Sequence, residues 1–330
     1  MADSIDTKKK IAAYRTGDVS DAVRIQLPAV ELIKHGYSFD SVDGVGGYEA
    51  PYFPNVDVAF MSRPHLPKLA EHYIETGKLL VVDTDDDFHA VPENHPGYMG
   101  VGRGRPEHLA KYEQCLKIAH VVTTTTEELK SRLLKFNKNV IVIPNGWSPD
   151  LEWVSFKKKN TNPTILWGGT VTHKQSFELC RFALEQHCRR DHNVKIIIAG
   201  DFGIYQSLKI AEHQKMFIPM MPYQEYWYTV GLADIILAPL EDTYFNGAKS
   251  PLRLTDTCAK GLPFIASPVG PYAGEEFKPC GYFATSPAEW RDCIGQAIHE
   301  NNPAMQASRK EVADRYRMEK LVQQWIEVIA

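Results

Sequence analysis

The chain has 330 residues, of which 44% are apolar and 24% charged, and its net charge is −4. This composition is sufficient for two buried cores and excludes a largely disordered protein. The small negative charge argues against a protein whose main task is to bind nucleic-acid phosphates, although it is compatible with a protein that acts on a nucleic acid.

The six cysteines are scattered along the chain without a C-x-x-C pair. We therefore expect reduced, mostly buried thiols and no zinc site. No apolar stretch approaches the ~20 residues of a membrane span, and the N-terminus has no apolar signal region. These features predict a cytoplasmic protein with no transmembrane segment, and the sequence carries no signal for an oligomeric state.

Apolar strand-like runs alternate with helix-length segments along the chain, which is typical of βαβ units and parallel sheets. In the first half we expect a strand that reaches Gly17, a helix over residues 21–35, and strands within residues 56–64 and 78–88. The next strand leads into a helix with Thr126 as its N-cap. The predicted fold class is therefore α/β.

Two residues after the first strand are candidates for the acceptor side of a ligand crevice. Gly17 forms a turn of the kind that commonly faces a ligand, and Arg24 follows it on the next helix, where a surface position is an equal alternative. The polar, lysine-rich segment 148–163 is the predicted interdomain linker. We interpret the basic patches at residues 100–108, 135–139 and 156–160 as solvated loops.

An aspartate triplet, Asp85, Asp86 and Asp87, directly follows an apolar strand. Carboxylates at the carboxyl end of a strand can hold a divalent cation. They can also line an acceptor crevice, where an aspartate or the nearby His89 would receive the acceptor proton. The third alternative is that the acids only cap a turn or the next helix.

The second half contains a strand–loop–helix unit suited to phosphate binding. The apolar run at 233–239 ends at a proline, and a polar loop follows it. Ser250 is the predicted N-cap of the next helix, with a proline at the first helical position. The helix N-terminus favours an anion, and Lys249 and Arg253 add two cations nearby. Asp256, on the same helical face as Arg253, can accept hydrogen bonds from ribose hydroxyls.

Several motifs in this half together resemble the donor domain of GT-B glycosyltransferases, in particular the retaining family 4 (glycosyl transferases group 1). They are VIVIPNGWSPD at 140–150, TILWGGTVTHKQSF at 164–177, VKIIIAGD at 194–201, the strands within 216–239, and YFNGAKSPLRLTDTCAKGLPFIAS at 244–267. The likeness covers residues 140–290 well and the first half loosely, and the order of the motifs makes it specific.

The resemblance implies a GT-B fold of two Rossmann-like doubly wound domains facing a cleft. It implies an N-terminal acceptor domain at 1–147, the linker at 148–163, a nucleotide-sugar domain at 164–315, and a C-terminal helix at 316–330 that crosses back to the first domain. The donor-binding residues that it implies are Gly169, Thr170, His173, Lys174, Met221, Asn246, Lys249, Ser250, Arg253 and Asp256. For His173 and Lys174 a solvent-facing position in the first helical turn is the alternative.

One departure from the family pattern concerns its pair of acids, which are separated by seven residues. Asp256 aligns with the second acid, and Ala248 stands at the position of the first. The first acid contacts the transferred sugar in the family, so its loss bears on the identity of the sugar and on the stereochemical outcome.

We therefore predict a hexosyl- or pentosyltransferase that uses a nucleotide-diphosphate sugar, UDP- or GDP-linked, with no obligatory cofactor or metal. The resemblance implies retention, and Asp85, Asp86 and His89 are the candidate catalytic residues. The acceptor classes left open are a glycan, a lipid-linked sugar, a protein and a modified nucleobase. Two alternatives are a metal-dependent transferase that uses the aspartate triplet, as in GT-A enzymes, and a homologue that binds a nucleotide or glycan without turnover.

Overall fold

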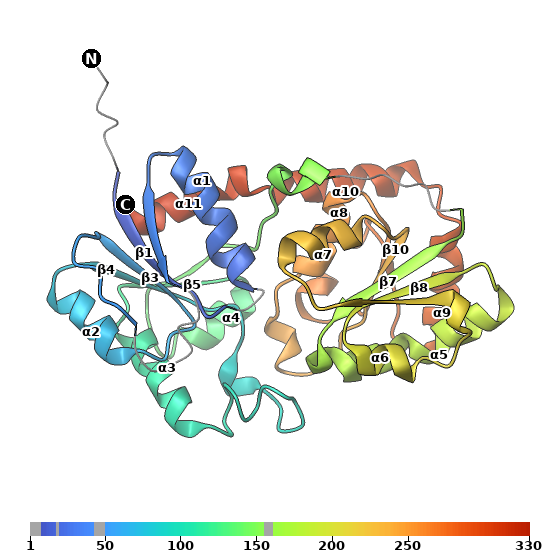
Figure 1. The fold of residues 1–330 in the computed structure, drawn as a ribbon, viewed down its shortest axis with the longest axis horizontal. Coiled ribbons are helices and arrows are strands. Elements are labelled where there is room, and N and C mark those ends of the chain that lie inside the picture. Colours follow the sequence, from blue (N-terminus) through green and yellow to red (C-terminus); the bar gives the residue numbers. More distant parts are fainter. Residues whose placement is uncertain (1–7, 18–19, 43–49, 155–160) are drawn as a thin grey trace, which may run out of the picture. The chain divides into compact units, whose positions relative to one another are not determined.

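The computed structural model describes residues 8–17, 20–42, 50–154 and 161–330. The chain forms two compact units (Figure 1). Unit 1 comprises Met1–Ser148, Ala248–Ser250 and Tyr316–Ala330, and unit 2 comprises Pro149–Gly247 and Pro251–Arg315. The basic patch predicted at 156–160 lies outside the described residues, as does part of the predicted linker, whose first residues form the 3₁₀ helix η3 (Pro149–Val154).

Unit 1 contains a parallel sheet of six strands in the order β2-β1-β3-β4-β5-β6. Every neighbouring pair in this sheet is parallel. The strand order reverses between β1 and β3, as in doubly wound folds that bind ligands beyond the carboxyl ends of their strands. The strands are β1 (Lys10–Tyr14), β2 (Ser38–Val42), β3 (Val58–Ser62), β4 (Leu79–Asp83), β5 (Val121–Thr124) and β6 (Val140–Val142).

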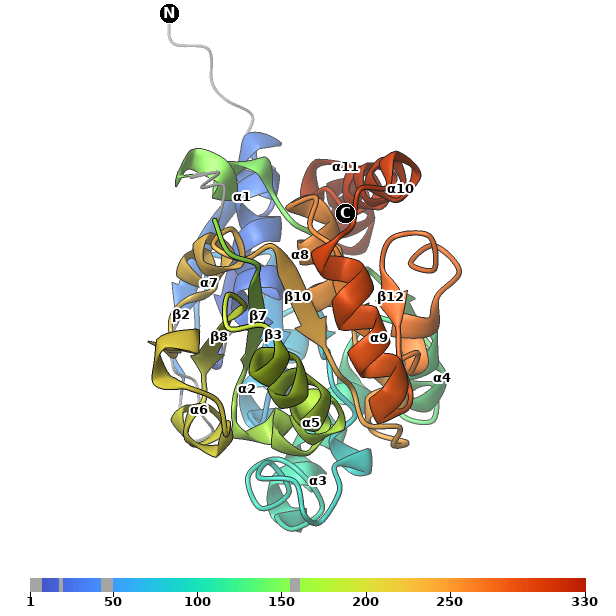
Figure 2. The same ribbon diagram turned by 90° about the vertical axis from the view of Figure 1, so that its right-hand side faces the viewer.

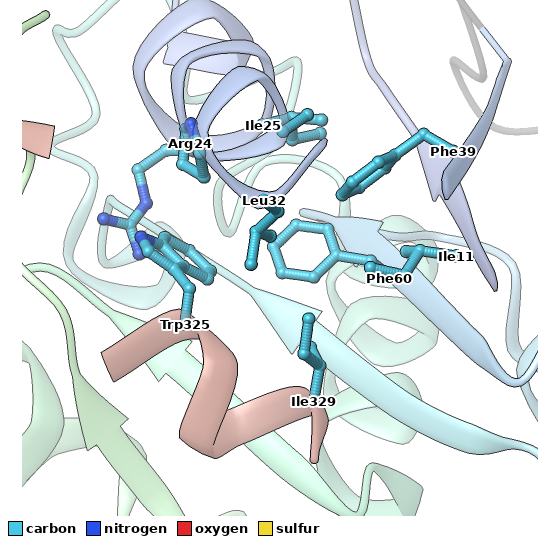
Figure 3. A pocket seen from close by; sticks show the side chains of 10 residues that line it. Ile11, Arg24, Ile25, Leu32, Phe39, Phe60, Trp325 and Ile329 are labelled. Atoms are coloured by element: carbon cyan, nitrogen blue, oxygen red, sulfur yellow. The ribbon is translucent and has the colours of Figure 1, made fainter. Parts of the chain in front are cut away.

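Helices cover both faces of this sheet, because alternate strand residues point to opposite sides. One face packs on α2 (Pro67–Glu75), α3 (Pro106–Ile118) and α4 (Glu127–Leu133). The other packs on α1 (Leu27–Lys34) and α11 (Met318–Ile329), which lie side by side. A small cavity of about 20 Å³ lies between α1, α11 and the sheet. Figure 3 shows residues that line it, such as Phe60, Leu32 and Ile329. It has room for no more than about one water molecule, so it is a packing defect.

Unit 2 repeats the architecture with a parallel sheet in the order β12-β11-β10-β7-β8-β9. Its strands are β7 (Thr164–Gly169), β8 (Lys195–Gly200), β9 (Lys215–Pro219), β10 (Ile235–Ala238), β11 (Phe264–Ala266) and β12 (Tyr282–Phe283). Apolar residues from both sheet and helices fill the core on the side of α5 (Lys174–Arg190) and α9 (Pro287–Ile298), which lie side by side in Figure 2. The short helix α6 (Phe202–Ser207) lies beside β9.

The remaining helices of unit 2 are α7 (Tyr223–Val230), α8 (Leu252–Ala259) and α10 (Pro303–Arg315), with α8 packed on α10. The aromatic run on α7 contributes to packing, because Tyr223 and Trp227 are buried. Short 3₁₀ helices complete the chain: η2 (Phe88–Ala90) in unit 1, and η4 (Val171–His173), η5 (Glu212–Gln214), η6 (Asn246–Ala248) and η7 (Gly270–Ala273) in the second half of the chain.

Two local predictions were wrong. The first strand ends at Tyr14, before Gly17. The helix predicted over 21–35 is confirmed, although its first part is a π-helical turn, Ala22–Gln26, that leads into α1. A reason for the wider turn is Pro28, which has no N–H to donate to the carbonyl four residues earlier. The N-cap of α8 is Pro251 rather than Ser250.

Three other predictions concern the cysteines, membrane-spanning helices and one helix cap. The cysteines are buried and form no disulfide. Among the described residues, no helix is both long and apolar enough to cross a membrane. The helix cap predicted at Thr126 is also confirmed, because its side chain accepts a hydrogen bond from Leu129 N.

Candidate functional site

The turn after β7 in unit 2 is built from residues that leave no space for side chains. A Cβ atom on Gly168 would lie 2.5 Å from the ring of Tyr226, and one on Gly200 would lie 2.3 Å from Gly169 O. Gly200 also has a φ of +109°, which a side chain rarely permits. A side chain at either position would clash with its neighbours, so the packing of this turn requires glycine at both.

The helix that follows this turn begins without a side-chain cap. Thr170 caps only the short η4, by accepting a hydrogen bond from Thr172 N at 3.4 Å. At α5 the N-cap is His173, which makes no side-chain cap bond, and Lys174 is exposed in the first turn. The backbone N–H of Lys174 donates to Val171 O, so η4 caps part of this helix end through the backbone. The positive end of the α5 dipole favours an anion here.

Arg253 of α8 brings a cation to the same turn. Its Nη2 donates to Gly168 O at 2.7 Å. The guanidinium therefore lies at the carboxyl end of β7, where the strand leads towards α5. Within unit 2, Gly169, Thr170, His173, Lys174 and Arg253 belong to this one region, which we call the β7 turn region.

Asp256, also on α8, is only 3% exposed. Its Oδ1 accepts a hydrogen bond from the Tyr223 hydroxyl at 2.8 Å. Burial raises the pKa of Asp256 to about 7, although the Tyr223 hydrogen bond and the charges of Lys260 and Arg253 oppose the shift. The contact of this carboxylate with ribose stays a prediction, and in this structure one of its oxygens is engaged by Tyr223.

Two further predicted donor residues have roles in the local packing of unit 2. Asn246 is buried, and its side-chain amide donates to Glu241 O at 2.9 Å, which closes the loop after β10. Met221 follows β9, and its sulfur accepts a hydrogen bond from the Thr229 hydroxyl at 3.2 Å. These contacts explain why both residue types fit their positions without reference to a ligand.

Lys249 and Ser250 belong to unit 1. The Lys249 ammonium forms an ion pair with Asp86 at 2.9 Å, and Ser250 Oγ accepts from Asn145 Nδ2 at 2.9 Å. Ala248, where the family has an acid, is 2% exposed within the apolar core of unit 1. A carboxylate at this position would be buried in apolar surroundings, which is unfavourable for a charged group.

The three aspartates after β4 have three different cationic neighbours. Asp85 lies 3.6 Å from Arg63, Asp86 pairs with Lys249, and Asp87 lies 3.2 Å from Arg132. Burial alone would raise the pKa of Asp87, but the hydrogen bonds and charges of His89 and Arg132 lower it below its usual value. Among the described residues, no group of three or more His, Cys, Asp or Glu side chains is placed to hold a metal ion.

His89 lies between two carboxylates. Its Nε2 is 3.1 Å from Glu113 and its Nδ1 is 3.7 Å from Asp87, while its ring stacks on Phe136. The backbone N–H of His89 also donates to Asp87, so the aspartate caps η2. This packing corresponds to the capping alternative for Asp87, and it gives no support to His89 as the base.

Gly17 and Arg24 differ in their exposure. Gly17 is exposed, has a φ of +83°, and donates its N–H to Asp21 at 2.7 Å. Arg24 is 1% exposed, and its Nη2 pairs with Asp83 at 2.6 Å while its guanidinium lies over the ring of Trp325 (Figure 3). The packing thus gives Arg24 a structural role and leaves the acceptor-side prediction for Gly17 alone.

Arg63 is a candidate that the sequence analysis missed. It follows β3 at the point where the strand order reverses, and it has a φ of +43°, the only positive φ of a non-glycine residue in the described ranges. Its Nη2 donates to Thr16 Oγ1 at 3.0 Å, and Asp85 lies 3.6 Å away. Strained backbone of this kind is typical of functional sites, but sequence pattern alone does not predict it for an arginine.

No protein-family model matches the chain, and no curated protein matches it in sequence. Solved structures do match. The sucrose-phosphate synthase of Thermosynechococcus elongatus is 12% identical with a TM-score of 0.69, over 97% of this chain and 98% of that chain. HepE of Anabaena, solved with UDP-glucose, is 13% identical with a TM-score of 0.69, over 98% and 99%.

A third neighbour, a Listeria monocytogenes protein described as a UDP-N-acetylglucosamine 2-epimerase, is 10% identical with a TM-score of 0.64, over 98% and 96%. At these identities the likeness establishes the fold alone. With its two parallel six-stranded sheets, each covered by helices, the chain has the GT-B fold of glycosyltransferases.

Proposed function

We propose that the protein is a glycosyltransferase that moves a sugar from a nucleotide-diphosphate sugar to an acceptor, with retention and without a metal ion. The observation that carries the proposal is the β7 turn region of unit 2. There Arg253 reaches Gly168 O, 2.7 Å away, and α5 begins without a side-chain cap. A cation and the N-terminal end of a long helix together form a suitable environment for a diphosphate.

The chemical role of this region is electrostatic. Negative charge develops on the diphosphate as the bond to the sugar breaks, and fixed donors that face this charge stabilise the transition state more than the ground state. Arg253 has N–H groups beyond the one that holds Gly168 O, so it can fix the turn and contact a phosphate oxygen at once. The named neighbours with UDP-linked ligands or substrates support a nucleotide-sugar donor.

Metal independence is supported by the pairing of the aspartate triplet. Asp85, Asp86 and Asp87 each have a separate cationic partner. A divalent cation would have to displace these partners and gather carboxylates that now face different side chains. This arrangement disfavours the metal-dependent alternative.

A screen of donors tests the proposal. The purified protein is incubated with UDP-, GDP-, ADP-, CMP- and dTDP-sugars, with and without EDTA, while nucleotide release and the unfolding temperature are measured. We expect one donor class to stabilise the protein and to be hydrolysed slowly at a rate that EDTA leaves unchanged. Loss of activity in EDTA would instead support the metal-dependent enzyme.

Variants of Arg253 test the β7 turn region itself. Removal of one such donor typically costs about 100-fold in turnover, so we expect this loss for Arg253→Ala and a smaller one for Arg253→Lys. Arg291→Ala, which removes an exposed arginine of the same unit that pairs with its neighbour Asp292, is the control. A wild-type rate in Arg253→Ala with a normal unfolding temperature would refute the assignment.

The alanine at position 248 favours a second candidate, a homologue that binds a nucleotide sugar without turnover, because it replaces the acid that contacts the transferred sugar in the family. Donor stabilisation without nucleotide release would identify such a binder. Conversion of the donor sugar to an epimer, detected by NMR, would identify an epimerase, the activity named for one neighbour.

A further inference from the structure

Residues Ala248–Ser250, which we call the inserted tripeptide, come from the loop between β10 and α8 but belong to unit 1. The chain enters unit 1 after Gly247 and leaves it before Pro251. Each of the three residues is held by a different side chain of unit 1. The three side chains that hold the inserted tripeptide are Thr126, Asp86 and Asn145.

The first anchor holds the backbone. Thr126, which caps α4, also donates its hydroxyl hydrogen to Ala248 O at 2.9 Å. Ala248 packs within the apolar core of unit 1, beside residues such as Leu129. The Thr126 hydroxyl therefore makes two hydrogen bonds. Its oxygen accepts from Leu129 N in α4, and its hydrogen is donated to the inserted tripeptide.

The third residue is held through a buried polar chain. The Asn145 amide oxygen accepts from Arg24 Nη1 at 3.1 Å, and its amide nitrogen donates to Ser250 Oγ at 2.9 Å. Because a guanidinium can only donate, it fixes which end of the amide faces Arg24 and therefore which end faces Ser250. Arg24 is in turn fixed by its ion pair with buried Asp83.

The middle residue, Lys249, is held at its tip by Asp86, with an Nζ–Oδ1 distance of 2.9 Å. Its ammonium stands on a flexible four-carbon chain and would otherwise sample many rotamers. The anchors on both sides fix its backbone, and Asp86 fixes its charge, although the lysine side chain keeps 19% of its surface exposed. Lys249 is therefore preorganised, with part of its surface open to a ligand.

We propose that Asp86, Thr126 and Asn145 are positioning residues that hold Lys249 in the orientation in which it binds the donor. This inference rests on the proposed function, since Lys249 is one of the two cations predicted for the donor phosphates. It assigns Asp86 an action through Lys249 in place of a separate role as an acid or base. Ion pairs and hydrogen bonds to charged groups of this kind are worth about 10- to 100-fold in a rate that depends on them.

A double-mutant cycle tests this action. We expect Asp86→Asn and Lys249→Ala each to lower kcat for nucleotide release by about 10- to 100-fold, and the double variant to be no slower than Lys249→Ala. Asp86→Glu, which keeps the carboxylate, should recover part of the rate. Asp40→Asn, at an aspartate of unit 1 that pairs with Lys10, is the control, and its effect should multiply with that of Lys249→Ala. Multiplicative effects for Asp86 and Lys249 would overturn the proposal.

A chemical readout separates this inference from the proposed function, because it needs no donor. Reductive dimethylation followed by mass spectrometry measures the reactivity of Lys249, and an ion-paired ammonium reacts slowly. We expect its modification to be several-fold faster in Asp86→Asn and Thr126→Val, but unchanged in Asp40→Asn, whose aspartate pairs with Lys10. Unchanged reactivity in Asp86→Asn refutes the positioning role even if no nucleotide sugar is a substrate. Faster reactivity supports it, while absent turnover of every donor refutes only the proposed function.

Discussion

Asp256 is a buried carboxyl whose protonation changes near neutral pH. Its pKa is about 7 in the folded protein, because burial outweighs the Tyr223 hydrogen bond, whereas an unfolded aspartate has a pKa of about 4. The raised value means that this group stabilises the fold at low pH and that this contribution is lost as the pH rises through about 7. The contribution is on the order of 4 kcal/mol at most.

We therefore expect Asp256→Asn to reduce the loss of unfolding free energy between about pH 5 and about pH 8, measured by urea denaturation. Tyr223→Phe removes a hydrogen bond that favours the charged carboxylate, so it should raise the pKa of Asp256 further and deepen the loss at high pH. An identical pH dependence in wild type and Asp256→Asn would contradict the assignment.

At the same scale, the sequence predicted which residues belong to the motif but not their partners. The position of Arg253 near the start of its own helix follows from local spacing, whereas its contact with Gly168 O, far away in the chain, does not. Lys249 binds Asp86, and Asp256 binds Tyr223, and both partners lie far away in the chain. The strained φ of Arg63 likewise depends on tertiary contacts, and no local sequence pattern predicts it.

At the scale of elements, the junction of β7 and β8 depends on Gly200. Alanine at this position meets both a positive φ and a contact of 2.3 Å with Gly169 O. Gly261 also has a positive φ, but no atom lies within 4 Å of the place that a Cβ would take, so it isolates the backbone cost. We expect Gly261→Ala to cost about 1 kcal/mol and Gly200→Ala about 2–4 kcal/mol in urea denaturation. Equal costs would show that the turn adapts.

Trp325 is one of the buried residues through which helix α11 packs on unit 1. The ring is 1% exposed, packs near Phe60, and faces the buried guanidinium of Arg24. We expect Trp325→Ala to destabilise unit 1 by about 3–5 kcal/mol, measured by circular dichroism in urea. Trp325→Phe keeps an aromatic face for Arg24, so its cost should be clearly smaller. A cost below that of a surface substitution would refute this role.

The elements themselves were largely predictable, because buried parallel strands leave continuous apolar runs and alternate with helices. The predictions failed at boundaries. The π-helical turn before Pro28 depends on backbone hydrogen bonds. Helix α8 starts at Leu252, after Ser250, whose side chain is bound by the distant Asn145. Each boundary residue contributes little to the stability of its element, so the local sequence does not fix where the element begins or ends.

At the scale of the whole molecule, the chain connects its two units repeatedly. A fragment of residues 149–315 contains all of unit 2 and adds only the inserted tripeptide. A fragment of residues 1–148 lacks the tripeptide and α11, and so exposes the apolar face that α11 covers. We expect the first fragment to fold on its own and the second to be largely unfolded, as judged by circular dichroism and NMR dispersion. Adding residues 316–330 as a separate peptide should partly restore the second, and a stably folded 1–148 would contradict this partition.

The position of α11 also bears on how the protein is made. During synthesis the strands of unit 1 leave the ribosome first, but the helix that covers one face of their sheet comes from residues 316–330. Unit 2 is complete once residue 315 has emerged, so the unit that begins earlier is finished later. Until residues 316–330 have emerged, the nascent chain therefore presents an apolar sheet face that α1 covers only in part, the kind of surface to which chaperones bind.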